Sequence, residues 1–276
     1  MKPFLADLHV HTVLSPCAEV EMIPPLIVQR AKELALGIIA ITDHNSAENV
    51  AAVMEAARGR ELAVLPGMEV QTKEEVHLLC LFDTVEQALL WQEEVYAHLP
   101  PLKNNDEVFG PQFVVDASGE FVRYNERLLL TSVSLSVEEV AAAVEARAGL
   151  CVASHIDRPA YSLLANLGFV PPGARLAALE LSRQANLEQL RAANPSLEGY
   201  ALIASGDAHQ LDQMSDRTVI TVEEPTIAEL GMAFPGQNSG RWWTINFMGV
   251  ADSNSVSSGT AWSGNISETG HLGVIP

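Results

Sequence analysis

Phe4-Leu5-Ala6-Asp7-Leu8-His9-Val10-His11-Thr12 is typical of a short apolar strand that ends in two histidines. Alternate residues of a β-strand point to the same face of the sheet. We therefore expect His9 and His11 to direct both imidazoles into one space at the end of the first strand. Imidazole is the commonest neutral ligand for zinc, iron and related metals. A lone His-X-His is usually only a polar strand end, so other residues of the same kind have to support a metal site.

The rest of the chain alternates strands with helices, which indicates a parallel sheet with crossovers. Pro24 opens the first helix, Gly37 is placed to close it, and Ser46 is placed to cap the second. About seven such units predict an α/β fold, a distorted seven-stranded TIM-like βα barrel with its functional site at the C-terminal ends of the strands. Strands are expected over residues 38–42, 62–66, 76–82, 150–154, 177–181, 201–205 and 217–222, and helices over 24–36, 47–58, 84–98, 136–148, 160–167, 187–193 and 226–233.

Two segments depart from this alternation. Residues 100–135 predict an inserted loop with a β-hairpin at 114–122, which we expect to cover the site. Residues 236–276 are rich in glycine, serine and asparagine, and the sequence assigns them no role. We therefore expect a barrel domain over residues 1–235 and a tail over 236–276.

Composition limits the choice of partners. The 276-residue chain is 48% hydrophobic, and its 35 acidic and 16 basic residues give a net charge of −19. Such a surface repels nucleic acid unless bound metal reverses the field locally, so a small substrate is favoured over polymeric nucleic acid, with a strand end still open. The three cysteines form no disulfide framework, and neither a signal peptide nor a membrane-spanning apolar run is apparent. These features predict a cytoplasmic protein without a membrane partner.

The histidines are not scattered at random. Six of the eight lie at or beside predicted strand ends: His9, His11, His44, His77, His155 and His209. Glu69 follows a predicted strand, and Asp207 stands two residues before His209. A carboxylate can bridge two ions because it has two oxygens, whereas a neutral imidazole cannot. This ligand set predicts two or three divalent ions close together.

These residues together resemble the PHP (polymerase and histidinol phosphatase) family. The resemblance rests on Asp7-Leu8-His9-Val10-His11-Thr12, Ile41-Thr42-Asp43-His44-Asn45, Gly67-Met68-Glu69, His155 and Asp207-Ala208-His209. It implies hydrolysis of a phosphate ester by a metal-activated hydroxide, with Mn, Zn or Fe in a cluster at the rim of the barrel. The implied metal ligands are His9, His11, His44, Glu69, His77, His155, Asp207 and His209.

One position differs from the family pattern. Six residues after its second histidine the family commonly has an aspartate or histidine ligand, and this chain has Cys17. A thiolate binds zinc or iron well because a metal lowers the pKa of the thiol. Cys17 is therefore a candidate ligand. The alternative is a small buried residue, with Glu19 or Glu21 supplying the ligand instead.

Further residues have candidate roles near the reacting ester. Asp207 or His209 could protonate the leaving oxygen. Arg158 and Arg183 each lie just past a strand end and are candidate phosphate clamps, because a guanidinium donates two parallel hydrogen bonds; the alternative is a surface salt bridge. Three aspartates neighbour candidate site residues and could orient imidazoles, or else cap loops and helices: Asp7, Asp43 and Asp157.

The sequence thus predicts a metal-dependent phosphoesterase acting on a small phosphorylated substrate, either a phosphomonoester or a nucleotide. Two alternatives remain. Amidohydrolases also place His-X-His on a first barrel strand, but they typically use a lysine as a modified bridging ligand. None of the four lysines of this chain (Lys2, Lys32, Lys73 and Lys103) lies in a predicted central strand. The second alternative is a metal-binding regulatory module without catalytic activity.

Overall fold

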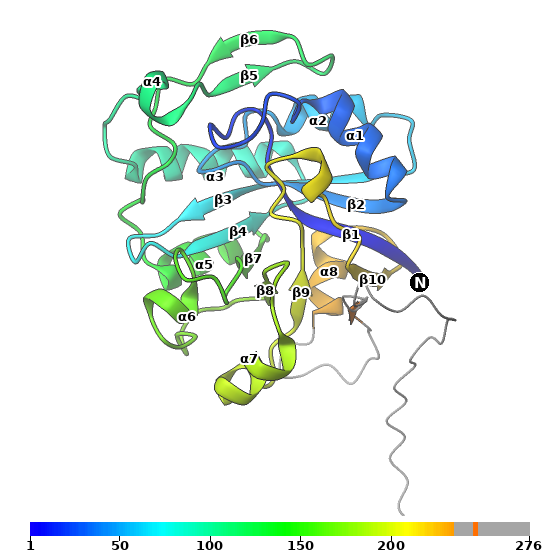
Figure 1. Ribbon diagram of the computed structural model, residues 1–276, viewed down its shortest axis with the longest axis vertical. Helices are drawn as coiled ribbons and strands as arrows, with labels where there is room; N and C mark the ends of the chain where they lie inside the picture. The colour runs from blue at the N-terminus through cyan, green and yellow to red at the C-terminus, as the bar shows by residue number, and fades with distance from the viewer. Residues whose placement is uncertain (235–244, 248–276) are drawn as a thin grey trace, which may run out of the picture.

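The core of the molecule is a strongly curved sheet with helices around it (Figure 1). The structure is a computed structural model that describes residues 1–234 and 245–247. Within these residues nine strands form one sheet in the order β11-β10-β1-β2-β3-β4-β7-β8-β9. The strands are β1 (Lys2–Val10), β2 (Leu36–Ile41), β3 (Ala63–Gln71), β4 (His77–Leu81), β7 (Leu150–Ala153), β8 (Ala178–Leu181), β9 (Leu202–Ala204), β10 (Thr218–Val222) and β11 (Ile245–Phe247).

The predicted α/β barrel is confirmed, but the expected number of strands was too low. β10 runs antiparallel to β1, and β11 runs antiparallel to β10, so they extend the sheet beyond the βα repeats. β11 lies within residues 236–276, which their composition led us to expect as a tail separate from the barrel. The rest of that tail lies outside the described residues.

The sheet is also not parallel throughout. β1, β2 and β3 run parallel, as do β7, β8 and β9, but β4 is antiparallel to both β3 and β7. In the β3–β4 pair, Gln71 at the end of β3 faces His77 at the start of β4. The N-terminal end of β4 therefore lies at the same rim as the C-terminal end of β3. This reversal brings His77 to the edge of the barrel where function was expected.

The side chain of Thr218 joins β10 to β9, where the curved sheet closes. The hydroxyl of Thr218 in β10 accepts a hydrogen bond from the backbone N–H of Ala204 in β9 (2.9 Å) and donates one to the carbonyl of the same residue (2.7 Å). Thr218 is almost fully buried. Buried backbone groups need such partners, so one threonine takes the place of a ladder hydrogen bond where the sheet closes.

Alternation along the strands divides the core into two layers. In β2, Ile39 and Ile41 face an outer layer that includes residues of α1 (Pro24–Glu33) and α2 (Val50–Ala56). Ile38 and Ala40 face the barrel interior, together with residues of α8 (Ile227–Ala233). The N–H of Ile227 bonds to Asp83, just beyond the C-terminal end of β4. Because β4 is reversed, α8 closes the barrel at the end opposite the histidines.

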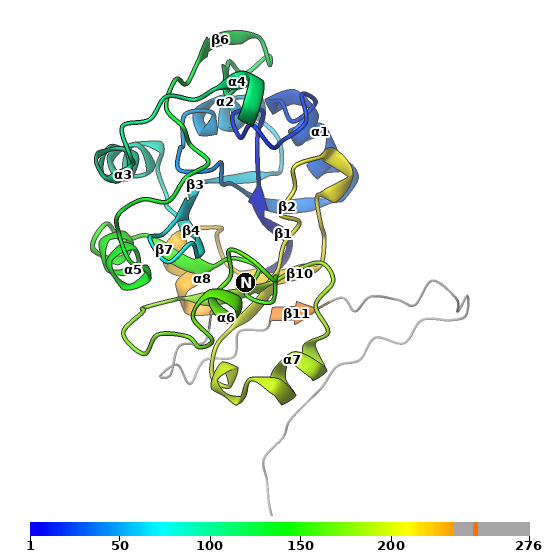
Figure 2. The same ribbon diagram turned by 60° about the vertical axis from the view of Figure 1, so that its left-hand side comes forward.

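The remaining helices surround the sheet (Figures 1 and 2). Within the described residues no helix is both long enough and apolar enough to cross a membrane. The helices are α3 (Val85–His98), α5 (Val137–Ala146), α6 (Leu163–Asn166) and α7 (Leu187–Ala193). The expected helix at 187–193 is confirmed, whereas the one expected at 160–167 is reduced to a single turn.

Two expected helix boundaries were wrong. Ala35, with a φ of 54°, makes the left-handed turn after α1. Gly37 instead lies within β2, where a Cβ atom would stand 2.6 Å from the ring of Phe4, so glycine is required there for packing. Asn49 rather than Ser46 precedes α2. The Ser46 hydroxyl bonds to side chains of α3, which ties the loop after β2 to that helix.

The inserted segment lies above the α1–α2 side of the barrel (Figure 1). It contains α4 (Asp106–Phe109) and an antiparallel hairpin of β5 (Phe113–Val115) and β6 (Phe121–Tyr124). The Asn49 side chain joins it to the barrel by donating to the carbonyl of Phe113 and accepting from the N–H of Val115. None of the residues lining the cavity described below comes from 100–135. The insertion instead contacts the loop after β2, where Asn45 donates to the carbonyls of Leu129 and Thr131, and its role as a cover stays a prediction.

Candidate metal centre

Glu69 lies at the centre of a buried cluster of histidines. Its side chain projects from β3 and is completely buried. Its two oxygens lie 3.0–3.5 Å from imidazole nitrogens that come from four different parts of the barrel rim. Oε1 is near His77 (3.0 Å), His9 (3.2 Å) and His155 (3.3 Å), and Oε2 is near His44 (3.1 Å) and His11 (3.5 Å).

The segment after β9 brings Asp207 to the same cluster. Ala208 pairs with the end of β1, since its N–H bonds to the carbonyl of His9 and its carbonyl accepts from the N–H of His11. This pairing places Asp207 Oδ1 3.2 Å from His9 Nε2 and 3.3 Å from His11 Nε2. The φ of Asp207 is 45°, a backbone strain of the kind that is common at functional sites.

Gly206 permits this approach. Its N–H donates to the buried carboxylate of Asp7 at 2.9 Å. A Cβ atom at this position would stand 2.7 Å from an oxygen of Asp7 and 2.5 Å from the carbonyl of Gln213. Only glycine fits, so Gly206 fixes the position of Asp207. Asp7 thus anchors the backbone next to the site and contacts no imidazole by hydrogen bond, which matches the capping alternative.

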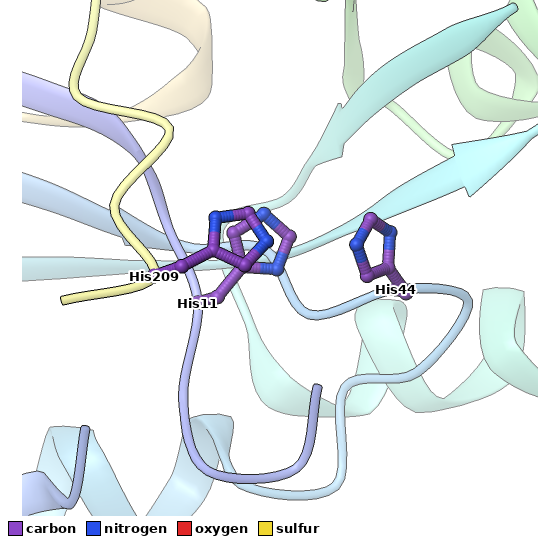
Figure 3. Close-up of side chains that lie close together, drawn as sticks. All are labelled: His11, His44 and His209. Atoms are coloured by element: carbon purple, nitrogen blue, oxygen red, sulfur yellow. The ribbon is translucent and has the colours of Figure 1, made fainter. Parts of the chain in front are cut away.

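Three groups of ligand atoms are close enough to hold metal ions. Within each group the candidate atoms lie within 4.8 Å of one another. Figure 3 shows the third group, in which the rings of His11 and His209 stack with centroids 4.0 Å apart. The groups are His9, His11, Glu69 and Asp207; His44, Glu69 and His77; and His11, His44 and His209. Glu69, His11 and His44 each belong to two groups. Glu69 would stand between neighbouring ions because a carboxylate has two oxygens, whereas each imidazole would bind one ion.

The buried acceptors of this cluster lack partners. Both oxygens of Glu69 and the Nδ1 atoms of His77 and His155 make no hydrogen bond, although they are buried. Buried polar groups without partners are costly and therefore rare. Divalent ions would satisfy these atoms, and carboxylate with imidazole is a ligand set that Mn, Zn and Fe accept. The residues present thus fit a metal cluster.

The cluster is also strongly coupled electrostatically. Burial disfavours the charged imidazolium, but Glu180, Glu69 and Asp207 together hold the pKa of His9 well above its usual value. Burial and the neighbouring His209 hold the pKa of His11 well below its usual value. Burial alone would raise the pKa of Glu69, but the surrounding histidines keep it well below the usual range. Glu69 is therefore a carboxylate, the form that binds cations.

Cys17 lies beside the third group. Cys17 is exposed, which contradicts the alternative of a small buried residue. Desolvation by the surrounding protein would raise the pKa of its thiol, but His44 and His209 lower that pKa to about 6, so a thiolate forms readily next to these rings. Cys17 is not a member of any of the three groups. Glu19 and Glu21 are both exposed, and Glu19 bonds to the side chain of Gln210. The ligand role of Cys17 therefore stays a prediction.

A cavity of about 900 Å³ opens beside the cluster. His155, Asp207 and His209 line it, together with both predicted phosphate clamps, Arg158 and Arg183. The guanidinium of Arg158 pairs with Oδ2 of Asp207 beside the cluster, and 44% of the Arg158 side chain is exposed, so its role as a phosphate clamp stays a prediction.

The other two candidate orienting aspartates differ from each other. Asp43 accepts hydrogen bonds from Ser15, whose hydroxyl lies 3.0 Å from Nδ1 of His11, so Asp43 acts on His11 through a serine. Asp157 accepts from the backbone and hydroxyl of Ser182 and holds the loop after β8. Only Asp43 therefore fits the predicted orienting role.

The sequence analysis missed Glu180. This residue lies in the apolar strand β8 and is about 1% exposed. Its Oε2 accepts from Nδ1 of His9 at 2.9 Å and from the backbone N–H of His155 at 3.0 Å. Hydrogen bonds of this kind fix the tautomer and orientation of a ligand histidine. The signal in the sequence was a single carboxylate inside an otherwise apolar strand.

Replacing Glu180 with alanine is expected to lower metal affinity about 10–100-fold, because His9 loses the acceptor that fixes Nε2 toward the cluster. Glu180→Gln keeps an acceptor and should have an intermediate effect. Competition with a chromogenic chelator measures both affinities, and Glu188→Ala on the exposed face of α7 is the control. Unchanged metal affinity in both Glu180 variants would contradict the orienting role.

The lysines argue against an amidohydrolase-type centre. All four are exposed, and the bridging position between the histidines is occupied by Glu69. A carboxylated lysine bridge therefore has no residue to form it.

Residues 7–185 match the PHP domain, which is more than half of the chain. The protein thus belongs to the PHP domain family, and its structure is a TIM-like PHP barrel. Asp207 and His209 lie beyond the matched residues, and it is the fold that places them with the others.

The similar proteins found by sequence and by structure are named as nucleases. An 80-residue segment, 27% of this chain, is 35% identical to the 5'-3' exoribonuclease Rnm of Escherichia coli strain K12 and spans only 26% of that enzyme's length. The lesion-specific endonuclease PfuEndoQ from Pyrococcus furiosus has a similar structure (TM-score 0.67, 19% identity, 88% of this chain and 58% of that chain). A complex of Endonuclease Q with a 27-mer duplex carrying an abasic lesion is also similar (TM-score 0.58, 19% identity, 84% and 56%).

Proposed function

We propose that this protein is a metal-dependent phosphoesterase that hydrolyses a phosphate ester of a nucleotide or of the end of a nucleic-acid strand. The observation that supports it most is the buried cluster around Glu69, in which carboxylate and imidazole atoms without hydrogen-bond partners surround three positions suited to cations. The ligands we propose are His9, His11, His44, Glu69, His77, His155, Asp207 and His209, with Cys17 as an additional candidate. Two or three ions of Mn, Zn or Fe would occupy the cluster.

The residues around the cavity have distinct proposed roles. Bound divalent ions supply an activated water and neutralise charge on the phosphoryl group. Arg158 lies against Asp207 at the edge of the cluster, where its guanidinium can donate to phosphoryl oxygens. His209 is the more accessible of the two candidate acids, with 22% of its side chain exposed against 8% for Asp207. His209 can donate a proton to the leaving oxygen only when its ring does not bind an ion, so its two proposed roles are alternatives.

The substrate preference drawn from net charge needs revision. The charge of −19 favoured a small substrate, but it is a property of the whole chain. The lining of the cavity holds Arg158 and Arg183 beside the acids Asp157, Glu180 and Asp207, so it is less acidic than the chain as a whole. Rnm is named an exoribonuclease, and Endonuclease Q binds a 27-mer duplex substrate with an abasic lesion at its active site. Together these observations support a nucleotide or strand end over an unrelated small phosphate.

Hydrolysis by protein reconstituted with manganese, zinc or ferrous iron tests this function. We expect turnover of a 5'-phosphorylated oligonucleotide or a mononucleotide, and a fall of about 100-fold in Asp207→Asn, which removes the charge near His9 and His11. A chromogenic monoester and diester, compared in parallel, distinguish a phosphatase from a nuclease.

The control for this experiment is Asp212→Asn, a change of the same chemistry in the short helix Leu211–Gln213. Absence of turnover with every metal, in protein shown to be folded and loaded, would reject the phosphoesterase. It would favour a regulatory module that binds metal without catalysis.

A further inference from the structure

The loop after β7 runs from one candidate metal ligand to another. It begins at His155, just beyond the end of β7, and leads through Tyr161 to the single turn of α6. The N–H of Arg158 donates to the carbonyl of His155 at 3.0 Å, and the hydroxyl of Ser162 donates to the carbonyl of Arg158 at 2.7 Å. The loop is therefore compact, and its far end brings Tyr161 against His77 at the start of β4.

Tyr161 holds His77 in two ways. The carbonyl of Tyr161 accepts a hydrogen bond from the backbone N–H of His77 at 3.1 Å. The ring of Tyr161 stacks on the imidazole of His77, with centroids 4.9 Å apart and an angle of 25° between the planes. Both the backbone and the side chain of this candidate ligand therefore contact the same residue.

The imidazole of His77 lacks the strong hydrogen bond that orients a ligand histidine elsewhere in the cluster. Nδ1 faces Oε1 of Glu69 at 3.0 Å, and these two residues share one of the three candidate groups. Nε2 makes only a long contact of 3.4 Å with Oε1 of Gln71, beyond the range of a good hydrogen bond. In contrast, Nδ1 of His9 lies 2.9 Å from the buried carboxylate of Glu180. Ligand histidines normally have such a partner, and at His77 the stacked ring of Tyr161 takes its place.

The backbone of Tyr161 is held in a costly conformation. Its φ is 57°, in the left-handed region that glycine adopts readily and a residue with a Cβ atom avoids. About 46% of the residue is exposed, so burial in the core does not account for this cost. Backbone strain of this kind is common at functional sites. In this conformation both the carbonyl and the ring of Tyr161 reach His77.

We propose that Tyr161 is a positioning residue that orients His77 toward one ion of the metal cluster. The proposal rests on the proposed function, because it takes His77 as a metal ligand. His77 belongs to only one of the three groups, with His44 and Glu69, so loss of its orientation should weaken mainly one ion position. The stacking requires the aromatic ring of Tyr161 and not its hydroxyl.

Zinc binding by the metal-free full chain tests this role without requiring turnover. Competition with a chromogenic chelator measures the affinities, and mass spectrometry of the native protein counts the bound ions. Tyr161→Leu should bind one ion about 10–100-fold more weakly than the wild type. Tyr161→Phe keeps the ring and should bind zinc like the wild type. Tyr124→Leu, which removes a half-exposed tyrosine from β6, is the matched control and should also bind zinc normally.

Tyr161→Gly separates positioning from a general effect on stability. Glycine relieves the left-handed strain, so metal-free Tyr161→Gly should melt at a higher temperature than metal-free Tyr161→Leu. Both variants lack the ring, so both should show the same loss of zinc affinity. A zinc affinity that instead follows the melting temperature of each variant would overturn the positioning role.

Two further results would also overturn it. One is an undiminished zinc affinity in Tyr161→Leu, and the other is a loss in Tyr161→Phe as large as that in Tyr161→Leu. Zinc binding that follows these expectations in a protein without turnover would reject only the proposed hydrolysis. A wild-type protein that binds no zinc would reject the metal centre and this proposal with it.

Discussion

Glu69→Gln is expected to reduce hydrolysis by at least about 1,000-fold, a loss of ~4 kcal/mol of transition-state stabilisation. Glutamine has nearly the same shape, but it is neutral and offers a single oxygen. Glu69 belongs to two of the three groups of candidate ligands, and its oxygens approach five histidines. Loss of the negative charge therefore affects two metal positions together, whereas loss of a histidine removes one nitrogen.

Metal content and activity should be measured on the same samples of the Glu69 variant. We expect mass spectrometry of the native protein to show fewer bound ions and the esterase assay to show little turnover at any metal concentration. Glu188→Gln provides a control for removing one carboxylate from an exposed helix. A Glu69→Gln protein with a full complement of metal and normal turnover would show that Glu69 does not bridge ions.

The position of the site could be predicted from the sequence because the signal is local. Histidines two residues apart on a strand share a face, and this holds for His9 and His11, whose Nε2 atoms lie 3.1 Å apart. Strand ends of a barrel meet at one rim, so residues such as His44 and Asp207 converge wherever the strands run parallel. Neither inference needs knowledge of long-range contacts.

Strand direction was not predictable in the same way. The apolar run that became β4 has the same pattern in a parallel or an antiparallel arrangement, since periodicity records burial and not direction. The expected strand over 76–82 already placed His77 near its start, which in a parallel sheet would lie at the rim opposite the other histidines. The reversed direction of β4 brings His77 to their rim instead.

Residues whose roles depend on tertiary contacts could not be predicted from the sequence either. Glu180 is separated by 171 residues from His9, and no spacing rule links them. Net charge likewise averages over the surface, while the field in the cavity depends on which charged side chains line it.

Removal of metal is expected to destabilise the folded protein strongly. Without metal, both oxygens of Glu69 are buried without a hydrogen bond, and so is Nδ1 of His77. An ion that binds only the folded state adds RT ln(1 + [L]/Kd), about 4 kcal/mol at a concentration 1,000 times the Kd. In a domain of this size each kcal/mol corresponds to roughly 2–4 °C in the melting temperature. Saturating metal should therefore raise the melting temperature by at least about 8 °C per tightly bound ion.

Thermal unfolding of chelated protein, titrated with each metal, measures this increase. The rise should depend on metal concentration and should be much smaller in Glu69→Gln, because that variant loses the carboxylate shared by two of the groups. The same comparison separates site formation from catalysis, since it requires no substrate. If the chelated and metal-loaded proteins have the same melting temperature, the buried histidines and carboxylates would have to satisfy one another's hydrogen bonds without metal. The cluster would then be part of a polar core and not a metal centre.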